Sequence, residues 1–422
     1  MPTPPVFSNL RSEIAGIPVT ELARRFGTPV YVYDAATILQ RLADLKAFDV
    51  VRYAQKACSN LAVVDLVRRH GALADAVSAG EIRRALAAGY CPQGTPPPIV
   101  YCADIFDAES LDLVIEKKVH VNCGSLDMID QLGSRAPGLG ITLRINPGFG
   151  HGHSRKTNTG GDASKHGIWH DQLGQCLAAA EKHDFSIVGA HMHIGSGTDT
   201  EHLSQVAAAM EKAAAAIGPS IESISAGGGL PVPYREGEAY VDLDLYYRLW
   251  NDARRRLEDR FSHAVRLEIE PGRYLVAESG FLVAEIRAVK RQAQNTFYLV
   301  DAGFNNLARP ILYGAYHPMA ICPADGRAAS GQAEVIVGGP LCESGDIFTQ
   351  QEGGFVVTRR LPEARVGDLL VIECAGAYAA AMASNYNSQP LAAEVLIQEG
   401  TPQLARRRQA FEEMIANERI VP

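Results

Sequence analysis

The sequence predicts an α/β protein that combines a (β/α)8 TIM barrel with a second, mainly-β domain. A chain of 422 residues is too long for one ordinary core, so two domains are expected. Strand-like and helical runs alternate about eight times through the first two thirds of the chain, as a TIM barrel requires. Beyond about Ser279, short β-rich runs with turn signals take over. An open, doubly wound sheet remains the alternative, because hydrophobic periodicity cannot show closure.

The elements of the predicted barrel follow a polar, proline-rich lead-in. A short helix is expected at Val19–Phe26, a strand at Val30–Tyr33 and a helix at Ala35–Lys46. Short apolar runs then predict the barrel strands Val50–Ala54, Leu73–Val77, Ile99–Cys102, Val119–Asn122, Ile141–Ile145, Ile187–Ile194, Ile221–Ser225 and Val265–Ile269. Helical runs lie between them, for example at Ala79–Ala88, Ala108–Lys118 and Ser204–Ile217. We therefore place the barrel at residues 29–279.

The second domain is expected to comprise residues 280–422, joined by the N-terminal segment 1–28. Its predicted strands are Leu282–Ala288, Thr296–Val300, Glu334–Val337, Gly354–Thr358 and Leu369–Glu373. Helical pattern is scarce until Arg406–Ala416, which makes this domain mainly β.

Composition excludes several classes of protein. A net charge of -8 argues against nucleic-acid binding as the main function. The sequence has no apolar run near the roughly 20 residues that cross a bilayer, and no signal peptide is evident at its start. Its eight cysteines include no Cys-x-x-Cys pair, which suits a reducing compartment. We expect a cytoplasmic protein that binds neither membrane nor nucleic acid.

The stretch Tyr53-Ala-Gln-Lys56-Ala follows an apolar strand, so Lys56 is expected at the carboxyl end of the first barrel strand. A helix begins behind Asn60, a good N-cap residue. A lysine in such a place either extends to solvent or is held in a site. Desolvation would lower the pKa of its amine and make it a nucleophile that forms an imine with an aldehyde. The other motifs at the same rim favour the second interpretation.

Those motifs are predicted at the carboxyl ends of the strands, where TIM-barrel active sites lie. Asp75 lies in the second strand, His193 and Ser196 end the sixth, Gly227-Gly228-Gly229 ends the seventh, and Glu270-Pro271-Gly272-Arg273 ends the eighth. Loops after the last two strands often bind phosphate, and glycines let backbone N–H groups approach its oxygens. Three glycines can also form a flexible turn, but their place here favours a phosphate site.

His191 and His193 lie two apart on one predicted strand and so share a face, as zinc ligands can. No completing set of ligands is evident at neighbouring strand ends, so we expect no metal. A packed or hydrogen-bonded histidine, or an imidazole stacked on an aromatic cofactor, explains the pair better. The polar, glycine-rich loop His151–Gly167 is either solvated or, given its length, a lid over the barrel mouth.

Three stretches stand out in the second domain: Arg309-Pro-Ile-Leu-Tyr313, Cys342-Glu343-Ser-Gly-Asp346 and Gly376-Ala-Tyr378. Taken one at a time, each has an ordinary explanation, namely a surface arginine before proline, a small buried cysteine and a β-turn. Their functional meaning depends on the whole set of motifs.

Over nearly the whole chain, the set resembles the alanine-racemase-like, fold type III barrel decarboxylases that use pyridoxal 5'-phosphate (PLP). The shared motifs are Tyr53-Ala-Gln-Lys56-Ala, His193-Ile-Gly-Ser196-Gly, Gly227-Gly-Gly-Leu, Glu270-Pro-Gly-Arg273, Cys342-Glu-Ser-Gly-Asp346 and Gly376-Ala-Tyr378. The loop from Gly150 to Gly167 is similar to that of the bacterial diaminopimelate decarboxylase branch, and ornithine and arginine decarboxylases are not expected to carry it. His166 departs from the pattern, since an aromatic residue is common there.

The resemblance implies a PLP-binding barrel. Lys56 would hold PLP covalently, Glu270 would pair with the pyridine nitrogen, and His193 would stack on the ring. The phosphate would be held by Ser196, Gly228, Gly229, Gly272, Arg273 and Tyr378. Asp75 and Glu81 match family positions near the cofactor.

The resemblance also implies a substrate and an assembly. The substrate would be bound by Arg273, Arg309, Tyr313, Glu343 and Tyr378. Arginine suits this task because its guanidinium grips a carboxylate with two hydrogen bonds. Cys342 would return a proton to the carbon that loses its carboxyl group. In this family a homodimer completes each site, with Cys342 and Glu343 from the partner subunit.

The implied reaction converts meso-2,6-diaminopimelate into L-lysine and CO2 at the D-configured carbon, the last step of lysine biosynthesis. One alternative keeps the chemistry but changes the substrate to ornithine, arginine, a D-amino acid or a siderophore or antibiotic precursor. A non-catalytic regulatory homologue and an amino-acid racemase are further alternatives. The presence of Lys56 and Cys342 argues against the regulatory homologue. A racemase would share the barrel and the lysine but is not expected to carry the Cys342-Glu343 motif.

Overall fold

The computed structural model describes residues 5–150, 159–195, 200–329 and 331–422. The chain divides into two compact units. Leu39–Pro231 and Tyr240–Leu275 form the first, which we call the barrel unit. The second, the β unit, contains the chain up to Ile38, Val232–Ala239 and Val276–Pro422. The chain thus passes between the units near residues 38, 231, 239 and 275, whereas the sequence analysis expected changes only at 28 and 279.

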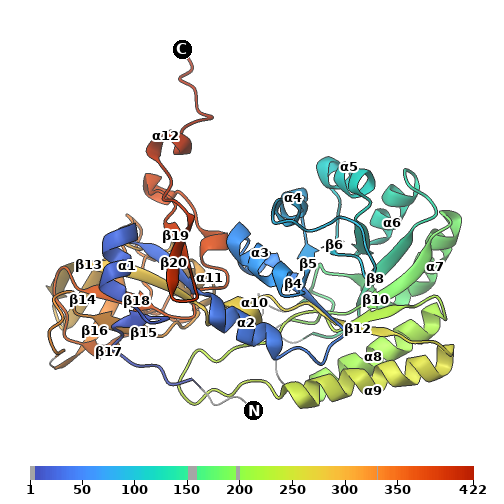
Figure 1. Ribbon diagram of the computed structural model, residues 1–422, viewed down its shortest axis with the longest axis horizontal. Helices are drawn as coiled ribbons and strands as arrows, with labels where there is room; N and C mark the ends of the chain where they lie inside the picture. The colour runs from blue at the N-terminus through green and yellow to red at the C-terminus, as the bar shows by residue number, and fades with distance from the viewer. Residues whose placement is uncertain (1–4, 151–158, 196–199, 330) are drawn as a thin grey trace. The chain divides into compact units, whose positions relative to one another are not determined.

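The barrel unit is built on a closed ring of eight parallel strands (Figure 1). In chain order they are β4 (Val50–Ala54), β5 (Leu73–Ala76), β6 (Ile99–Ala103), β7 (His120–Cys123), β8 (Gly140–Asn146), β10 (Ser186–His191), β11 (Ser223–Ser225) and β12 (Arg266–Ile269). Closure is made where β10 pairs with β8, while β12 pairs with β4. The predicted TIM barrel is confirmed, and the open sheet is excluded. The short strand β9 (Ile168–Trp169) adds to β8 outside the ring.

Helices follow the barrel strands because the chain supplies a capping residue soon after many of them. Asn60 accepts a hydrogen bond from the backbone of Ala62, and Ser78, Asp107, Ser125 and Asp242 cap later helices in the same way. The helices of the unit are α3 (Leu61–Arg69), α4 (Ala79–Ala87), α5 (Ala108–Lys117), α6 (Leu126–Gly133), α7 (Leu173–Lys182), α8 (Thr200–Ile217) and α9 (Leu243–Phe261). Figure 1 shows these helices around the outside of the strands.

The β unit is sheet-rich, and its sheet includes residues from both ends of the chain. Its strands are β1 (Glu13–Ile14), β2 (Ile17–Pro18), β3 (Val30–Asp34), β13 (Gly280–Gln292), β14 (Asn295–Val300), β15 (Met319–Cys322), β16 (Gln332–Gly338), β17 (Arg359–Pro362), β18 (Leu369–Ile372), β19 (Ala393–Gln398) and β20 (Thr401–Arg406). Strand β3 lies between β13 and β19, so residues 30–34, which the sequence placed in the barrel, contribute a strand to this sheet. The apolar core includes Val32, Val283, Val371 and Val395.

Few helices accompany these strands. They are α1 (Val19–Phe26), α11 (Arg309–Tyr313) and α12 (Phe411–Met414), while α2 (Ala35–Ala43) and α10 (Arg273–Val276) span the changes of unit. No helix in the described parts of the chain is long and apolar enough to span a membrane.

Two predicted elements of the β unit are wrong. Gly354–Thr358 is not a strand, because Gly353 and Gly354 both have positive φ, and the strand β17 begins only at Arg359. The helix expected at Arg406–Ala416 is restricted to α12, because β20 continues to Arg406 by pairing with β19. Sheet pairing here overrides the helical propensity of the sequence.

Candidate active site

Lys56 lies directly after β4, in a single 3-10 turn formed by Gln55–Ala57. The turn is fixed from beneath, because buried Gln55 donates from Nε2 to the carbonyl oxygens of Asp75 (3.3 Å) and Glu81 (3.1 Å). Lys56 itself is exposed. The lysine thus stands at the predicted strand end, but the burial expected for it is not present in this chain alone.

Neighbouring loops at this rim are joined by backbone hydrogen bonds. The N–H of Met192 donates to Ser225 (3.2 Å), that of Glu270 to Gly227 (2.8 Å) and that of Ala54 to Pro271 (3.1 Å). The bonds hold the glycine loop and the Glu270-Pro271-Gly272 turn side by side. Their tight approach explains the glycines, since a Cβ on Gly228 would overlap the carbonyl oxygen of Glu270. The rim is thus lined with bare backbone next to Gly272 and Arg273.

Glu270 is the central carboxylate of the barrel unit. It is buried, and its Oε2 lies 2.8 Å from Nε2 of His191, while its Oε1 accepts a hydrogen bond from Ser225 Oγ at 3.1 Å. Burial alone would raise the pKa of Glu270, but the charge and hydrogen bond of His191, with help from Arg52 and Ser225, outweigh it and hold the pKa below its usual range. Glu270 is therefore an ionised carboxylate in the barrel interior.

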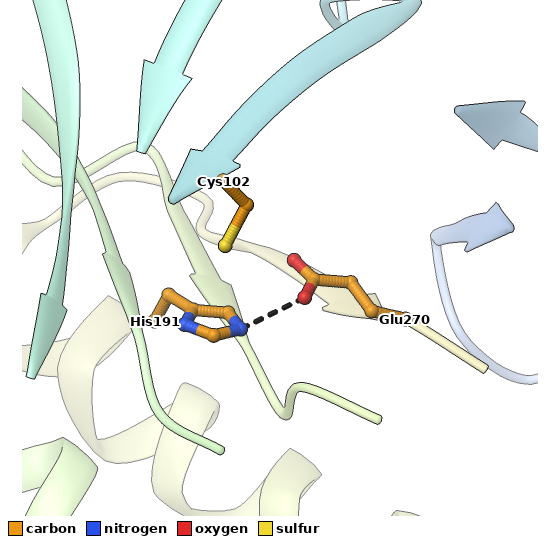
Figure 2. A group of neighbouring side chains, drawn as sticks. All are labelled: Cys102, His191 and Glu270. Atoms are coloured by element: carbon orange, nitrogen blue, oxygen red, sulfur yellow. Dashed lines mark hydrogen bonds and ion pairs between the residues drawn. The ribbon is translucent and has the colours of Figure 1, made fainter. Parts of the chain in front are cut away.

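Cys102, at the end of β6, completes a buried cluster with His191 and Glu270 (Figure 2). Their donor atoms lie within 4.8 Å of one another, close enough to ligate one metal ion such as zinc. The set is not visible in the sequence, because Cys102 and Glu270 are far from His191 in the chain. Burial, with the charges of Asp75 and Glu270, raises the pKa of the Cys102 thiol well above its ordinary value. Within the cluster only Glu270 and His191 are joined by a hydrogen bond, while Cys102 Sγ accepts from Asn122 Nδ2 at 3.1 Å.

Asp75 is the second buried carboxyl group, and it behaves oppositely to Glu270. Burial, followed by the negative charge of Glu270, raises the pKa of Asp75 to about 8. Its Oδ1 is buried and has no hydrogen-bond partner among the described residues. Two nearby carboxyl groups whose pKa values are pushed apart are typical of sites that need one charged and one neutral acid.

His193 follows β10 and is half-buried. Desolvation, with the positive charges of Arg144 and Lys56, lowers the pKa of its imidazole well below the ordinary value. The ring is therefore neutral at physiological pH, which suits stacking on an aromatic cofactor better than ion pairing.

The loop expected to act as a lid is partly described. Residues 151–158 and Ser196, a predicted phosphate ligand, lie outside the described residues. At the end of the loop, His166 Nδ1 lies 2.7 Å from Asp104 Oδ2, and the Gly167 N–H donates to Asp104 Oδ1 at 2.8 Å. Asn146 Nδ2 also donates to the carbonyl oxygen of His166 at 3.2 Å. The departure at His166 thus has a local role, which is to anchor the end of the loop to the barrel.

The remaining predicted site residues lie in the β unit. Arg309, at the start of α11, is buried, and its guanidinium lies 4.9 Å from the ring centre of Tyr234. Tyr313 ends the same helix. Tyr378 has a positive φ of 58°, in the turn after Gly376.

Cys342 and Glu343 are both exposed in the β unit. Their turn is organised by buried Asp346, whose carboxylate accepts from the N–H groups of Phe304 (2.7 Å) and Leu341 (2.8 Å). The Cys342 N–H donates to Asn387 Oδ1 at 2.7 Å. The turn is firmly built although its two reactive side chains reach solvent.

Sequence reasoning missed several polar groups inside the barrel. They are Arg52, Cys102, Asn122, Arg144 and Glu268, all buried. A signal was present, since Arg144 interrupts the apolar run Leu143-Arg144-Ile145 of a predicted strand, and a charge in such a run points to a polar barrel interior.

The family of pyridoxal-dependent decarboxylases, through its pyridoxal-binding domain, matches residues 36–277. This range contains every strand of the closed barrel and the cluster around Glu270. The chain therefore belongs to the pyridoxal-dependent decarboxylase family.

Individual relatives narrow the assignment. The diaminopimelate decarboxylase of Escherichia coli strain K12 is 54% identical over 399 residues, which covers 94% of this chain and 95% of the relative. A crystal structure of a diaminopimelate decarboxylase, also 54% identical, has a TM-score of 0.93 and covers 95% of this chain and 96% of its own. A crystal structure of a diaminopimelate decarboxylase of Helicobacter pylori in complex with L-lysine is 31% identical and has a TM-score of 0.83. The match covers 94% of this chain and 98% of that one. The predicted kinship with bacterial diaminopimelate decarboxylases is confirmed.

Proposed function

We propose that this protein is a PLP-dependent enzyme that decarboxylates meso-2,6-diaminopimelate to L-lysine and CO2. The geometry of Glu270 carries the proposal: its buried carboxylate lies 2.8 Å from Nε2 of His191 and accepts from Ser225 Oγ, and a carboxylate held in this way can keep the ring nitrogen of PLP protonated. When bound, PLP supplies a ring that takes up the electron pair left by the departing CO2. The names of the relatives and their full-length coverage support the choice of substrate.

The barrel unit fits this cofactor. Lys56 offers an exposed amine at the strand end, and His193 offers a neutral ring. Backbone N–H groups around Gly228, Gly229, Gly272 and Arg273 would bind the phosphate oxygens, with Ser196 and Tyr378 as further ligands. Asp75, with its orphaned oxygen, would donate a proton or accept one next to the cofactor. These assignments extend to Glu81, whose carboxylate accepts from the Val77 N–H at 2.8 Å.

For the substrate, we propose that Arg273, Arg309, Tyr313, Glu343 and Tyr378 bind the amino-carboxylate end that does not react. A guanidinium left without its anion is costly, so lysine and ornithine should bind poorly. Cys342 would protonate the carbon that has lost its carboxyl group, with its thiol as the general acid.

We further propose a homodimer with shared active sites, in which Cys342 and Glu343 serve the site of the other subunit. Their exposure in a single chain, on a turn that is otherwise rigid, supports this assembly. A cytoplasmic location is also proposed, and the eight free cysteines support it.

The decisive experiment measures CO2 release from meso-diaminopimelate with and without added PLP. Wild-type protein should release CO2 and form L-lysine, and borohydride should fix the cofactor on Lys56. Lys56→Ala should lose both CO2 release and borohydride labelling. Lys117→Ala, a surface control, should keep both. Faster CO2 release from L- or D-ornithine would contradict the substrate, and racemisation without CO2 would contradict the reaction class.

A further inference from the structure

A polar cavity of about 140 Å³ lies inside the barrel. At one end it is lined by Glu270, His191 and Ser225. At the other it is lined by Thr95 and Glu222, which precede β6 and β11 and are exposed to solvent. The cavity therefore extends from the Glu270–His191 pair toward the amino-terminal end of the barrel, opposite to the strand ends that carry Lys56.

The cavity is suited to water. TIM-barrel interiors are normally filled by side chains, whereas this one leaves room for several water molecules, each of which occupies about 30 Å³ in the liquid. The walls are polar, with Arg52, His120, Asn122 and Glu268 among them. Asn122 Oδ1 is buried without a hydrogen-bond partner among the described residues, so it too requires a water.

The geometry of His191 determines the positions of its protons. An ionised carboxylate can only accept hydrogen bonds, so Nε2 carries the hydrogen that faces Glu270 at 2.8 Å. The other nitrogen, Nδ1, is buried and has no partner among the described side chains and backbone. The side chain is only 1% exposed, and it lines the cavity. Cavity water is therefore the available partner for Nδ1.

We propose that His191 is a positioning residue whose Nε2–H keeps Glu270 ionised and oriented, and whose Nδ1 is linked through cavity water to solvent at the amino-terminal end of the barrel. This inference rests on the proposed function, since Glu270 matters as the partner of the PLP ring nitrogen. It also explains how the two buried carboxyl groups come to differ, because Oδ1 of Asp75 has no such donor among the described residues. Other titratable or charged groups around the pair are Arg52, Lys56, Glu81, Cys102, Arg144, His193 and Glu268.

The first test uses the cofactor-free protein, so that it does not depend on activity. Infrared difference spectra report whether a carboxyl group is protonated. His191→Phe removes the donor and should add the band of one protonated carboxyl, which disappears when Glu270→Gln is added. His191→Gln retains a donor and should resemble wild type. An unchanged spectrum in His191→Phe overturns the proposal.

A second measurement uses PLP labelled with 15N in its ring. Wild type and His191→Gln should show a protonated ring nitrogen, whereas His191→Phe should shift toward the unprotonated form. Its kcat should fall about 10- to 100-fold, with a smaller change in KM, as is typical when the partner of a functional ligand is lost. If wild type binds no PLP, the proposed function fails, while the infrared result still decides the role of His191. PLP binding with an identical nitrogen signal in His191→Phe would overturn the role alone.

The water link is tested separately. Ala190 lines the cavity, so Ala190→Leu should fill part of it and Ala190→Gly should not. Deuterium exchange at the C2 position of the His191 ring, resolved from His193 by fragment mass spectrometry, reports access of water. Exchange should slow several-fold in Ala190→Leu and match wild type or exceed it in Ala190→Gly. Equal rates in all three proteins would exclude the cavity as the route.

Discussion

The guanidinium of Arg309 donates from Nη1 to Nε2 of His317 over 2.8 Å, inside the β unit. His317 is fully buried, and its Nδ1 donates to the carbonyl oxygen of Glu373 at 3.0 Å. Because a carbonyl oxygen only accepts, Nδ1 carries the proton and the lone pair of Nε2 faces the arginine. Tyr234 packs edge-on against the same imidazole at 5.5 Å. The orientation of Arg309 is thus fixed by a neutral histidine whose tautomer is set by the backbone.

If Arg309 binds the substrate carboxylate, loss of this support should weaken substrate binding more than it slows the chemistry. His317→Ala should raise the KM for meso-diaminopimelate about tenfold and change kcat much less. A change of about tenfold in affinity corresponds to the free energy of a hydrogen bond to a charged group. His317→Gln is the matched control, since an amide offers one acceptor and one donor. Steady-state kinetics would refute the idea if both variants behaved alike or if kcat fell while KM stayed constant.

Asp75 should make the cofactor-free protein less stable as the pH rises. Burial and then the charge of Glu270 raise the pKa of Asp75 to about 8, whereas the ordinary value for an aspartate is 3.8. Between these values the folded chain keeps a proton that the unfolded chain has released. The contribution of this proton to the free energy of unfolding is therefore complete below about pH 4. It is lost as the pH rises toward 8, at up to about 1.4 kcal/mol per pH unit.

The check on Asp75 is a series of urea denaturations from pH 5 to pH 8. Asp75→Asn stays neutral throughout, so its stability should fall less steeply with pH than that of wild type. Asp127→Asn, at an exposed position of α6, should preserve the wild-type slope. Parallel curves for Asp75→Asn and wild type would show that Asp75 is ionised in the folded chain.

Much of the barrel could be predicted because each strand is a short apolar run that is legible by itself. All eight expected strands are present within a few residues, and Val50–Ala54 is matched at both ends. The strand β19, by contrast, is not marked by turn residues that would distinguish it in the sequence. Its place beside β3 depends on residues more than 350 positions away. The glycine and Glu270 motifs were found because they stand at strand ends. The contact of His191 with Glu270 could not be predicted, because the hydrogen bond joins residues 79 positions apart.

The buried ion pair of Arg52 and Glu268 should be important for the stability of the barrel. Nε and Oε2 lie 2.6 Å apart, with side chains 2% and 7% exposed. Arg52→Met removes both hydrogen bonds to the buried Glu268 and leaves it only the longer contact with Arg266 Nε at 4.0 Å, which should cost up to about 3–5 kcal/mol of unfolding free energy. Adding Glu268→Leu should recover part of the loss. Arg83→Met, which breaks an exposed pair with Glu109, should cost less than about 1 kcal/mol in the same urea titration.

Shared active sites predict that two inactive variants can restore each other. Lys56→Ala removes a barrel residue and Cys342→Ala a residue of the exposed turn, so each homodimer has two defective sites. In a mixed dimer, one site receives both defects and the other receives none. Random mixing after co-expression should therefore give about a quarter of wild-type CO2 release, because half of the dimers are mixed and each has one intact site. If Cys342 instead served the barrel of its own chain, every site in the mixture would carry one defect and no activity would return. Mixing Lys56→Ala with Glu270→Gln, two barrel variants, is the control that should stay inactive in either case.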